Sequence, residues 1–375
     1  MVDVLFVTMD GGGNLPPALG IAREIVRQGG TARFLGHEPQ RQFIEAAGFG
    51  FEAVRLGRDY DSAAPRNTFT GLRDLTAVFA DANIGLDAIR NARDEPTDIV
   101  IVDCLLLGAL ETVVTAGLPA ASLVHTLWSF FQQESRGPVG GIMRIRGIRM
   151  RKALESPALS LVTVRPDFEP AGLGPLPVGV QHVGVVWQGT PRTARPAGGP
   201  PVVLVSLSTA RFPGQEKALQ SVLDALDGLE LAAVVTTGPT IDPARLRAAA
   251  NTTVHRFVDH SEIMPGASLV IGHGGHSTTA RALAHDLPLI IMPMHPLMDQ
   301  PAIGRAVARH GAGRVMSKSA KPTAIRAAVL ELLADGPHRE AAARLGASIR
   351  DRDGAVIAVG LLDEFVASRS RDTAR

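Results

Sequence analysis

Short apolar runs alternate along the chain with longer segments in which apolar residues recur at helical spacing. The short runs are typical of buried parallel strands, and the longer segments are typical of amphipathic helices. In the first half, the pattern predicts strands at residues 4–8, 32–35, 98–102 and 120–124, with helices at 17–27 and 41–47. In the second half, it predicts strands at 202–206, 232–236, 253–257, 268–272 and 289–292, a helix at 215–226 and a helical tail from about 321.

The two alternating series are separated by one segment without periodicity. Residues 189–201 hold several Pro, Gly and Arg residues, which is the composition of a linker. Alternating strands and helices predict a parallel sheet, so each series is expected to form one Rossmann-like domain. The predicted fold class is therefore α/β, with two such domains.

Composition and charge exclude only a few classes of protein. The 375 residues carry a net charge of +1 and are 45% hydrophobic, which fits a globular protein and gives no sign of a nucleic-acid partner. A single cysteine, Cys104, excludes an internal disulfide framework and a multi-cysteine metal site. The apolar run at 4–9 lacks a basic leader, and no apolar stretch reaches the ~18 residues of a membrane span. We therefore expect a cytoplasmic protein without stable membrane insertion.

Polar and small residues follow many of the predicted strands, where parallel sheets bind their ligands. The positions are Asp10, 11–14, Asp103, His125, 206–209, 273–278 and Asp299. Their presence in both halves predicts a ligand cleft between the two domains. The clearest position is the turn after strand 268–272, where Gly274 and Gly275 precede a helix start. Since free N–H groups and the helix dipole attract anions, this turn predicts a phosphate site.

A longer motif surrounds that turn. The run from His273 to Pro293, followed by Asp299-Gln300 and 311–313, resembles the donor-binding motif of family 1 glycosyltransferases, most of all the bacterial natural-product branch. The resemblance implies a GT-B fold, in which two Rossmann-like domains face each other across an interdomain cleft. It implies an N-terminal acceptor domain at 1–188, the linker at 189–201, a donor domain at 202–352, and a helix at 353–375 that returns to the N-terminal domain.

The resemblance also assigns roles to residues of the donor site. It implies a UDP- or TDP-sugar as co-substrate, with no cofactor and no metal. The nucleobase would be held by backbone groups near Val258, the sugar hydroxyls by Asp299 and Gln300, and the facing loop would contribute Ser206, Ser208 and Thr209. The pyrophosphate would be held by His273, Gly274, Gly275, Ser277 and Thr278. We expect His276 to be exposed or to support these residues.

The sequence departs from the family at the expected catalytic base. Most members carry a Gly-His pair after the first strand, but this chain has Gly13-Asn14. An asparagine amide positions groups by hydrogen bonds and does not act as a base. Three alternatives stay open: Asp103 acts directly, His125 or Asp10 replaces the missing histidine, or the acceptor needs little help from a base. For the same reason, the sequence leaves open whether the sugar is transferred to an oxygen, a nitrogen or a carbon atom of the acceptor.

The acceptor site is less well defined. Gly12 and Gly13 lie in the first turn, and Trp128 and Phe131 belong to the densest aromatic cluster, which is either an apolar acceptor wall or core packing. The run 143–151 alternates basic and apolar residues, as in a membrane-surface segment, a cover for a lipophilic acceptor, or a solvated face interrupted by Gly147. His37 is expected on a loop surface.

The function predicted from these features is inverting transfer of a hexose or deoxyhexose to a small lipophilic acceptor such as a natural-product aglycone. The expected partners are the nucleotide-sugar donor and the acceptor, and a homodimer is left open. Two rival hypotheses are a sugar-nucleotide epimerase or hydrolase of the same fold, and a nucleotide-sugar-binding protein without catalysis.

Overall fold

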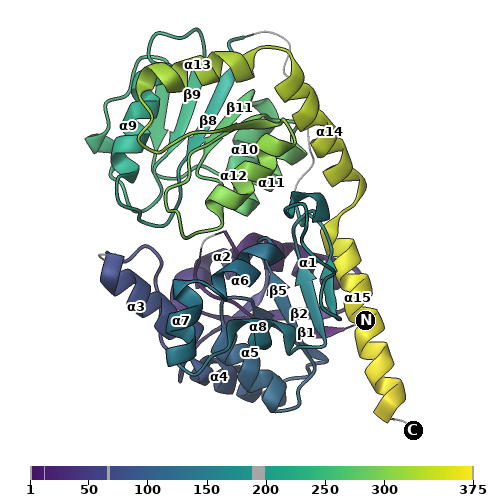
Figure 1. The fold of residues 1–375 in the computed structure, drawn as a ribbon. Coiled ribbons are helices and arrows are strands. Elements are labelled where there is room, and N and C mark those ends of the chain that lie inside the picture. Colours follow the sequence, from purple (N-terminus) through teal and green to yellow (C-terminus); the bar gives the residue numbers. More distant parts are fainter. Residues whose placement is uncertain (1, 12, 66–67, 188–198, 374–375) are drawn as a thin grey trace. The chain divides into compact units, whose positions relative to one another are not determined.

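The computed structural model describes residues 2–11, 13–65, 68–187 and 199–373 (Figure 1). The chain falls into two compact units, of which unit 1 is Met1–Trp187 with Asp353–Arg375 and unit 2 is Gln188–Arg352. Gly12 and most of the predicted linker lie outside the described residues. Within the described part of the chain, no helix combines the length and hydropathy needed to cross a bilayer.

Unit 1 is built on a seven-stranded parallel sheet with the order β3-β2-β1-β4-β5-β6-β7. Its described strands are β1 (Asp3–Val7), β2 (Thr31–Gly36), β3 (Gly50–Ala53), β4 (Ile99–Asp103), β5 (Ala120–Val124), β6 (Leu159–Val162) and β7 (Val180–His182). The central strands β4 and β5 are buried along their whole length, as expected for a parallel sheet covered on both faces.

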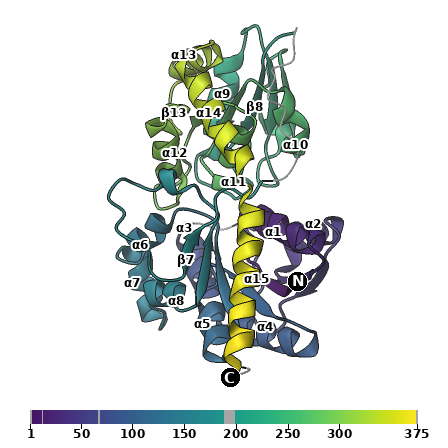
Figure 2. The same cartoon turned by 90° about the vertical axis from the view of Figure 1, so that its right-hand side faces the viewer.

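Helices cover this sheet. They are α1 (Leu15–Arg27), α2 (Arg41–Ala46), α3 (Thr68–Phe79), α4 (Ala82–Asp94), α5 (Leu107–Thr115), α6 (Trp128–Glu134), α7 (Pro138–Ile145), α8 (Met150–Glu155) and α15 (Gly354–Thr373), with 3₁₀ turns at Glu38–Gln40 and Pro166–Phe168. The C-terminal helix α15 packs along α1 (Figure 2). Ala358 and Leu362 of α15 are fully buried in the same core as Ile21 of α1, so α15 is part of this unit.

Unit 2 has a six-stranded parallel sheet with the order β10-β9-β8-β11-β12-β13. The strands are β8 (Val202–Ser206), β9 (Ala232–Thr236), β10 (Thr252–His255), β11 (Leu269–Gly272), β12 (Leu289–Ile291) and β13 (Gly313–Val315). The helices are α9 (Gln215–Leu226), α10 (His260–Ile263), α11 (His276–Ala284), α12 (Gln300–Arg309), α13 (Pro322–Leu333) and α14 (Pro337–Asp351), with 3₁₀ turns at Pro243–Arg245 and Met264–Gly266.

Each sheet reverses its strand order once, and the reversal places a crevice at the carboxyl ends of two strands. In unit 1 the reversal falls between β1 and β4, where Val7 is paired with Val102. In unit 2 it falls between β8 and β11, where Ser206 is paired with Gly272. The turns with Asp10–Asn14, Asp103, Ser206 and His273 therefore follow the strands that flank these two points.

The predicted fold class is confirmed, since two parallel-sheet Rossmann-like units are present. Twelve strands and helices predicted from hydrophobic patterns are found within two residues of their expected ends. The strand predicted at 253–257 is found at Thr252–His255, where it pairs with β9, so Phe257 lies beyond its end and is 71% exposed. The short strands β3, β6, β7 and β13 were not predicted, because three or four residues are too few to show a period.

Candidate active site

The departure at position 14 has a clear structural consequence. Asn14 immediately precedes α1, and its amide nitrogen donates to the carbonyl of Met9 at 2.7 Å and to Asp103 Oδ2 at 2.5 Å. Because both neighbours are acceptors, the amide can be placed only with its nitrogen toward them. Asn14 Oδ1 is buried and has no hydrogen-bond partner. Asn14 therefore holds the carboxylate of Asp103 in place.

Asp103 ends β4 and is only 3% exposed. Its other oxygen, Oδ1, accepts a hydrogen bond from the backbone N–H of Leu105 at 2.9 Å and lies 3.2 Å from His125 Nε2. Burial favours the neutral acid, but His125, Asn14 and the Leu105 N–H together outweigh it and lower the pKa of Asp103. The carboxylate is thus ionised, buried and occupied by three donors, which makes it a poor direct base.

His125 follows β5 and forms the other half of an ion pair with Asp103. Burial disfavours its protonation, but the ionised Asp103 and side-chain hydrogen bonds to Cys104 and Asp103 raise the pKa of His125 well above its usual value. Its side chain is 13% exposed, compared with 3% for Asp103. Among the predicted candidates for proton transfer, His125 therefore combines a carboxylate partner with the better access.

A second buried histidine lies beside this group, and sequence reasoning placed it wrongly. His37 was expected on a loop surface, but it is fully buried at the end of β2. Its Nδ1 accepts the backbone N–H of Asp10 at 3.2 Å, and Nε2 is buried without a hydrogen-bond partner. Burial lowers the pKa of His37, so the ring is neutral and carries its proton on Nε2. Its position directly after a strand was the available signal.

Asp10 connects two loops at this edge of the sheet. Its carboxylate accepts the backbone N–H of Ser62 at 2.7 Å and so ties the loop after β3 to the turn after β1. Gln40 adds a second brace, because its amide donates to the Met9 carbonyl at 2.9 Å and its Oε1 accepts from His37 N at 3.1 Å. The buried polar network therefore fixes the backbone around Asn14.

Asp103, Cys104 and His125 also form a group whose oxygen, sulfur and nitrogen atoms lie within 4.8 Å of one another. Such donors suit a metal ion in principle. Here the carboxylate already accepts three hydrogen bonds, and burial raises the pKa of the Cys104 thiol, which favours the protonated form. The group therefore fits a proton-handling pair with an adjacent thiol better than it fits a metal site.

The predicted acceptor residues have mixed outcomes. Trp128 and Phe131 are only 1% and 3% exposed, so these two rings pack in the core and do not form an exposed wall. Of the two alternatives for these rings, core packing is the one observed. Gly13 is exposed, and a side chain there would meet no atom within 4 Å, so the glycine leaves open space beside Asn14.

The turn between β11 and α11, which the sequence predicts to bind the donor, depends on two glycines. Gly274 has φ of 90°, and a Cβ there would lie 2.9 Å from the carbonyl oxygen of Gln300. Gly275 is the N-cap of α11, and a Cβ on it would lie 2.6 Å from His273 Nε2. Ser277 and Thr278 occupy the first turn of α11 and are partly exposed. Their backbone N–H groups have no acceptor within the helix, so this end of α11 is suited to an anion.

His273 lies directly beside this helix end. Burial lowers the pKa of His273 to about 4, against a smaller opposite effect of the Ser206 backbone. The imidazole is therefore neutral near pH 7, and its Nδ1 is buried without a hydrogen-bond partner. A neutral ring leaves one nitrogen as donor and one as acceptor, which suits hydrogen bonding to a phosphate or its ester oxygen.

The loop after β8 carries backbone strain. Ser208 has φ of 119°, which is rare for a residue other than glycine, and its carbonyl accepts the amide of Gln215 at 2.9 Å. Ser206 ends β8 and Thr209 is exposed. A strained backbone that is held by its surroundings is common at ligand-binding sites.

The predicted sugar-binding residues lie at the start of α12. Asp299 is its N-cap and Gln300 its first residue. Gln300 is 4% exposed, and its Oε1 accepts the backbone N–H groups of Met294 at 2.7 Å and His295 at 3.2 Å. Half of its amide therefore braces the preceding loop. Val258 lies in the loop after β10.

Two further histidines of unit 2 border this edge. His276, in the first turn of α11, is 8% exposed, so of the two alternatives predicted for it an exposed ring is excluded and a supporting role stays a prediction. His260 was not predicted. Its Nε2 lies 3.3 Å from Thr236 Oγ1, and burial together with Arg281 lowers the pKa of His260 to about 4. Its position soon after β10 was the only signal in the sequence.

Comparison with known proteins agrees with this geometry. The family model for the C-terminal domain of erythromycin biosynthesis protein CIII-like proteins matches residues 220–353. The 4'-demethylrebeccamycin synthase of Lentzea aerocolonigenes is 25% identical over 97% of this chain and 99% of its own length. Among solved structures, the calicheamicin glycosyltransferase CalG4 aligns with a TM-score of 0.76 at 21% identity, and VinC in complex with DTDP with 0.74 at 18%. Both alignments cover 98% of this chain, with 98% of CalG4 and 100% of VinC.

Two parallel-sheet units with a glycine turn before α11 give this chain the GT-B fold. The chain is a glycosyltransferase, and it resembles the family 1 enzymes of the natural-product branch.

Proposed function

We propose that this enzyme transfers a hexose or deoxyhexose from UDP- or TDP-sugar, with inversion, to a small lipophilic acceptor. Unit 2 would bind the donor at the amino end of α11. Unit 1 would bind the acceptor and supply the base at the carboxyl ends of β1, β4 and β5. The observation that carries the proposal is the pairing of His125 with the buried carboxylate of Asp103.

The donor half of the proposal rests on charge. When the bond between sugar and phosphate breaks, negative charge develops on the nucleoside diphosphate. The amino end of α11, the hydroxyls of Ser277 and Thr278, and neutral His273 are suited to stabilise that charge. The structure of VinC, a structural neighbour, was solved with DTDP, which supports a pyrimidine nucleoside diphosphate as the ligand here.

The catalytic half assigns the base to His125. In the neutral ring, the proton on Nε2 points to Asp103 Oδ1, because a carboxylate requires a donor there. Nδ1 then carries the lone pair that accepts the acceptor proton. Asp103 stabilises the imidazolium that forms, as in other carboxylate–histidine pairs. Asn14 is a positioning residue, because it donates to Asp103 Oδ2, the carboxylate oxygen that does not face His125.

The first experiment tests the donor site without any acceptor. Thermal unfolding is measured in EDTA with UDP, TDP, GDP or NAD. A ligand at ~100 times its dissociation constant stabilises the fold by about 2.7 kcal/mol. We expect UDP or TDP to stabilise the wild type and Ser277→Ala/Thr278→Ala to lose the response. A matched variant, Ser221→Ala/Thr323→Ala, removes two helix hydroxyls of α9 and α13 and is expected to keep it. Equal responses of the two variants would refute the donor assignment.

The second experiment separates transfer from the rival reactions. The enzyme is incubated in EDTA with the stabilising nucleotide's glucose or deoxyhexose conjugate, with and without a set of phenols and alicyclic alcohols. A transferase consumes the donor mainly when an acceptor is present and forms a new glycoside of inverted anomeric configuration. Rapid donor loss without acceptor would support the hydrolase or epimerase hypothesis. Binding without any turnover would support a non-catalytic protein.

A further inference from the structure

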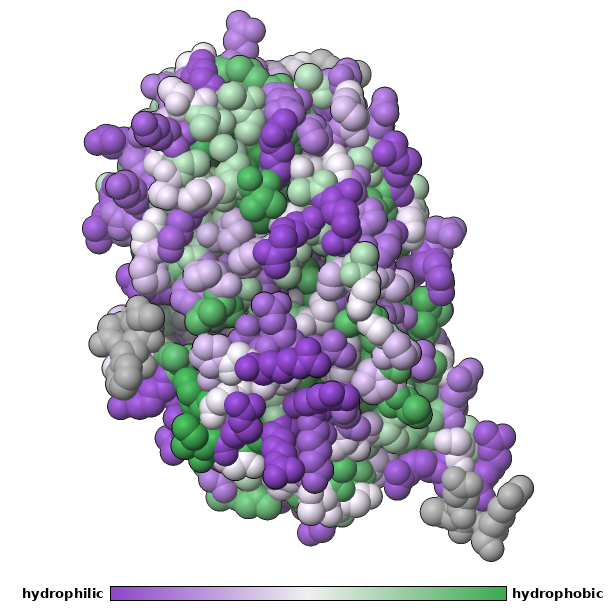
Figure 3. Space-filling model, viewed as in Figure 1, coloured by the Kyte–Doolittle hydropathy of each residue, from purple (hydrophilic) through white to green (hydrophobic). Residues whose placement is uncertain are grey.

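A basic surface of unit 1 spans α7, α8 and the turns before and between them, outside the proposed active site. Residues 134–155 contain six basic and two acidic residues and so carry a net charge of +4, although the whole chain carries only +1. All six basic side chains are exposed. We call this set the basic face; it consists of Arg136, Arg144, Arg146, Arg149, Arg151 and Lys152. Hydrophilic side chains gather over α7 and α8 in Figure 3.

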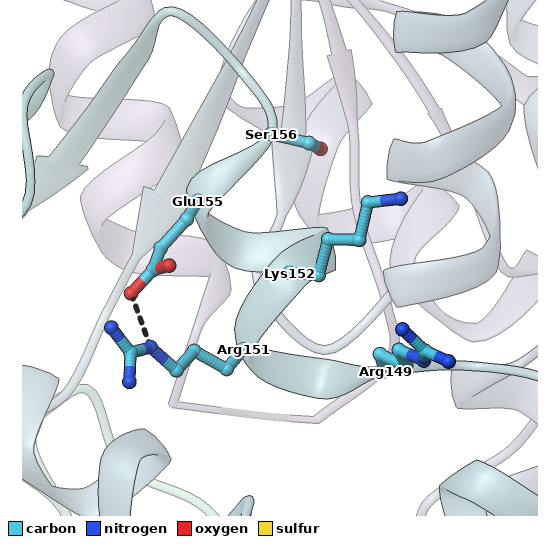
Figure 4. A pocket seen from close by; sticks show the side chains of 5 residues that line it. All are labelled: Arg149, Arg151, Lys152, Glu155 and Ser156. Carbon is cyan, nitrogen blue, oxygen red and sulfur yellow. Dashed lines mark hydrogen bonds and ion pairs between the residues drawn. The ribbon is translucent and has the colours of Figure 1, made fainter.

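The basic face is organised by the fold. Arg144 donates to the carbonyl of Ser135 at 3.1 Å, which ties α7 to the end of α6. Arg149, Arg151 and Lys152 line a shallow hollow together with Glu155 and Ser156 (Figure 4). Arg151 is paired with Glu155 at 2.8 Å, whereas no pairing with the other lining residues is drawn for Arg149 or Lys152. The hollow therefore keeps an excess of positive charge.

One large apolar side chain, that of Ile145, is exposed among the residues of the basic face. Met143, Ile148 and Met150 of the same run are buried, but Ile145 is 88% exposed between Arg144 and Arg146. The reason is the turn after α7, where Gly147 has φ of 87° and Ile148 N donates back to the Met143 carbonyl at 2.9 Å. This turn directs Ile148 into the core and leaves Ile145 at the surface.

We propose that the basic face and Ile145 dock this enzyme reversibly on an anionic membrane surface. Anionic lipid head groups attract clustered Lys and Arg side chains, and an apolar side chain among them gains by entering the acyl boundary. A dissolved anion would engage the charges but would give Ile145 no apolar environment. The exposed isoleucine therefore favours a lipid surface as the partner. This proposal does not depend on the identity of the sugar donor or of the base.

The test is co-sedimentation of the full chain with vesicles in the absence of substrates. Vesicles of phosphatidylcholine with about 30% phosphatidylglycerol are compared with pure phosphatidylcholine, at roughly 0.05 and 0.5 M NaCl, where screening differs strongly. We expect binding only to the anionic vesicles at low salt. Each basic side chain near the surface contributes about fivefold to binding, so Arg149→Glu/Lys152→Glu should lower the partition coefficient at least about 25-fold. Ile145→Glu should lower it at least about fivefold.

Matched variants make the test specific to this surface. Val178→Glu changes another exposed apolar residue of unit 1, in a stretch without charged neighbours in sequence. Lys321→Glu/Arg344→Glu reverses two exposed charges on unit 2. Both are expected to bind vesicles like the wild type. The proposal is overturned if anionic vesicles do not bind the wild type at low salt, if neutral vesicles bind it equally, or if the matched variants lose as much binding as the basic-face variants.

Discussion

Replacing Gly274 by alanine should be the most damaging small change in the donor turn. Its φ of 90° lies in the left-handed region, where an alanine costs roughly 1–2 kcal/mol. The new Cβ would also lie 2.8 Å from Ile291 Cγ2 and 2.9 Å from the Gln300 carbonyl oxygen, and such overpacking costs about 1–3 kcal/mol. We therefore expect Gly274→Ala to destabilise unit 2 by about 2–5 kcal/mol.

Two neighbouring glycines provide graded controls. At Gly272 the nearest atom to a new Cβ is the Ser206 carbonyl oxygen at 3.7 Å, an ordinary contact, so Gly272→Ala should stay within about 1 kcal/mol of the wild type. At Gly275 φ is −63°, and the three atoms nearest to the new Cβ all belong to the ring of His273. Gly275→Ala should therefore fold with a cost of about 1 kcal/mol but should displace His273 and weaken nucleotide binding at least about tenfold.

Differential scanning calorimetry of the three variants measures these differences. For a unit of this size, 2–5 kcal/mol corresponds to a decrease in Tm of roughly 4–20 °C. Titration with UDP or TDP then reports binding by the variants that remain folded. A transition of unit 2 in Gly274→Ala that matches Gly272→Ala would refute the steric argument. Unchanged nucleotide affinity in Gly275→Ala would remove His273 and the adjacent helix end from the donor site.

The remaining predictions concern titratable groups. His125→Gln should lower kcat about 10²–10⁴-fold with unchanged donor binding. Because the pKa of His125 is raised, the wild-type rate should increase as the pH rises above 7 and the ring loses its proton. A flat pH profile would contradict the assignment of His125 as the base. In Asp103→Asn, the new NH₂ group would face either Asn14 Nδ2 or the Leu105 N–H, both of which are donors. The free energy of unfolding of unit 1, measured in urea, should therefore fall by about 1–3 kcal/mol. The pKa values of His273 and His260 are lowered to about 4 in the folded protein, so the unfolded chain binds more protons than the folded one at acidic pH. Unit 2 should therefore be fully stable above about pH 6.5 and should lose about 3 kcal/mol per histidine as the pH falls to 4. Urea unfolding in a pH series measures this loss.

Local patterns in the sequence predicted the segment from β11 to α11 well. Strand β11, the glycine turn and α11 are contiguous, so their order, the positive φ at Gly274 and the helix start follow from neighbouring residues. The same holds for α9, whose predicted and observed bounds coincide at Gln215 and Leu226. The sequence was less informative where burial decides the role of a side chain. Trp128, His37 and His276 all have residue types that occur both inside and on the surface of proteins.

The sequence by itself therefore determined the two α/β units, the glycine turn before α11 and the presence of Asn14 where the resemblance leads one to expect a histidine. Only the tertiary structure decided what this replacement means. Asn14 and Asp103 are 89 positions apart, and Asp103 and His125 are 22 apart. Parallel pairing of β4 with β1 and with β5 brings the three side chains to one edge of the sheet. Neither hydrophobic periodicity nor motif spacing specifies which side chain there is buried and which keeps access to solvent, because that depends on packing among distant segments.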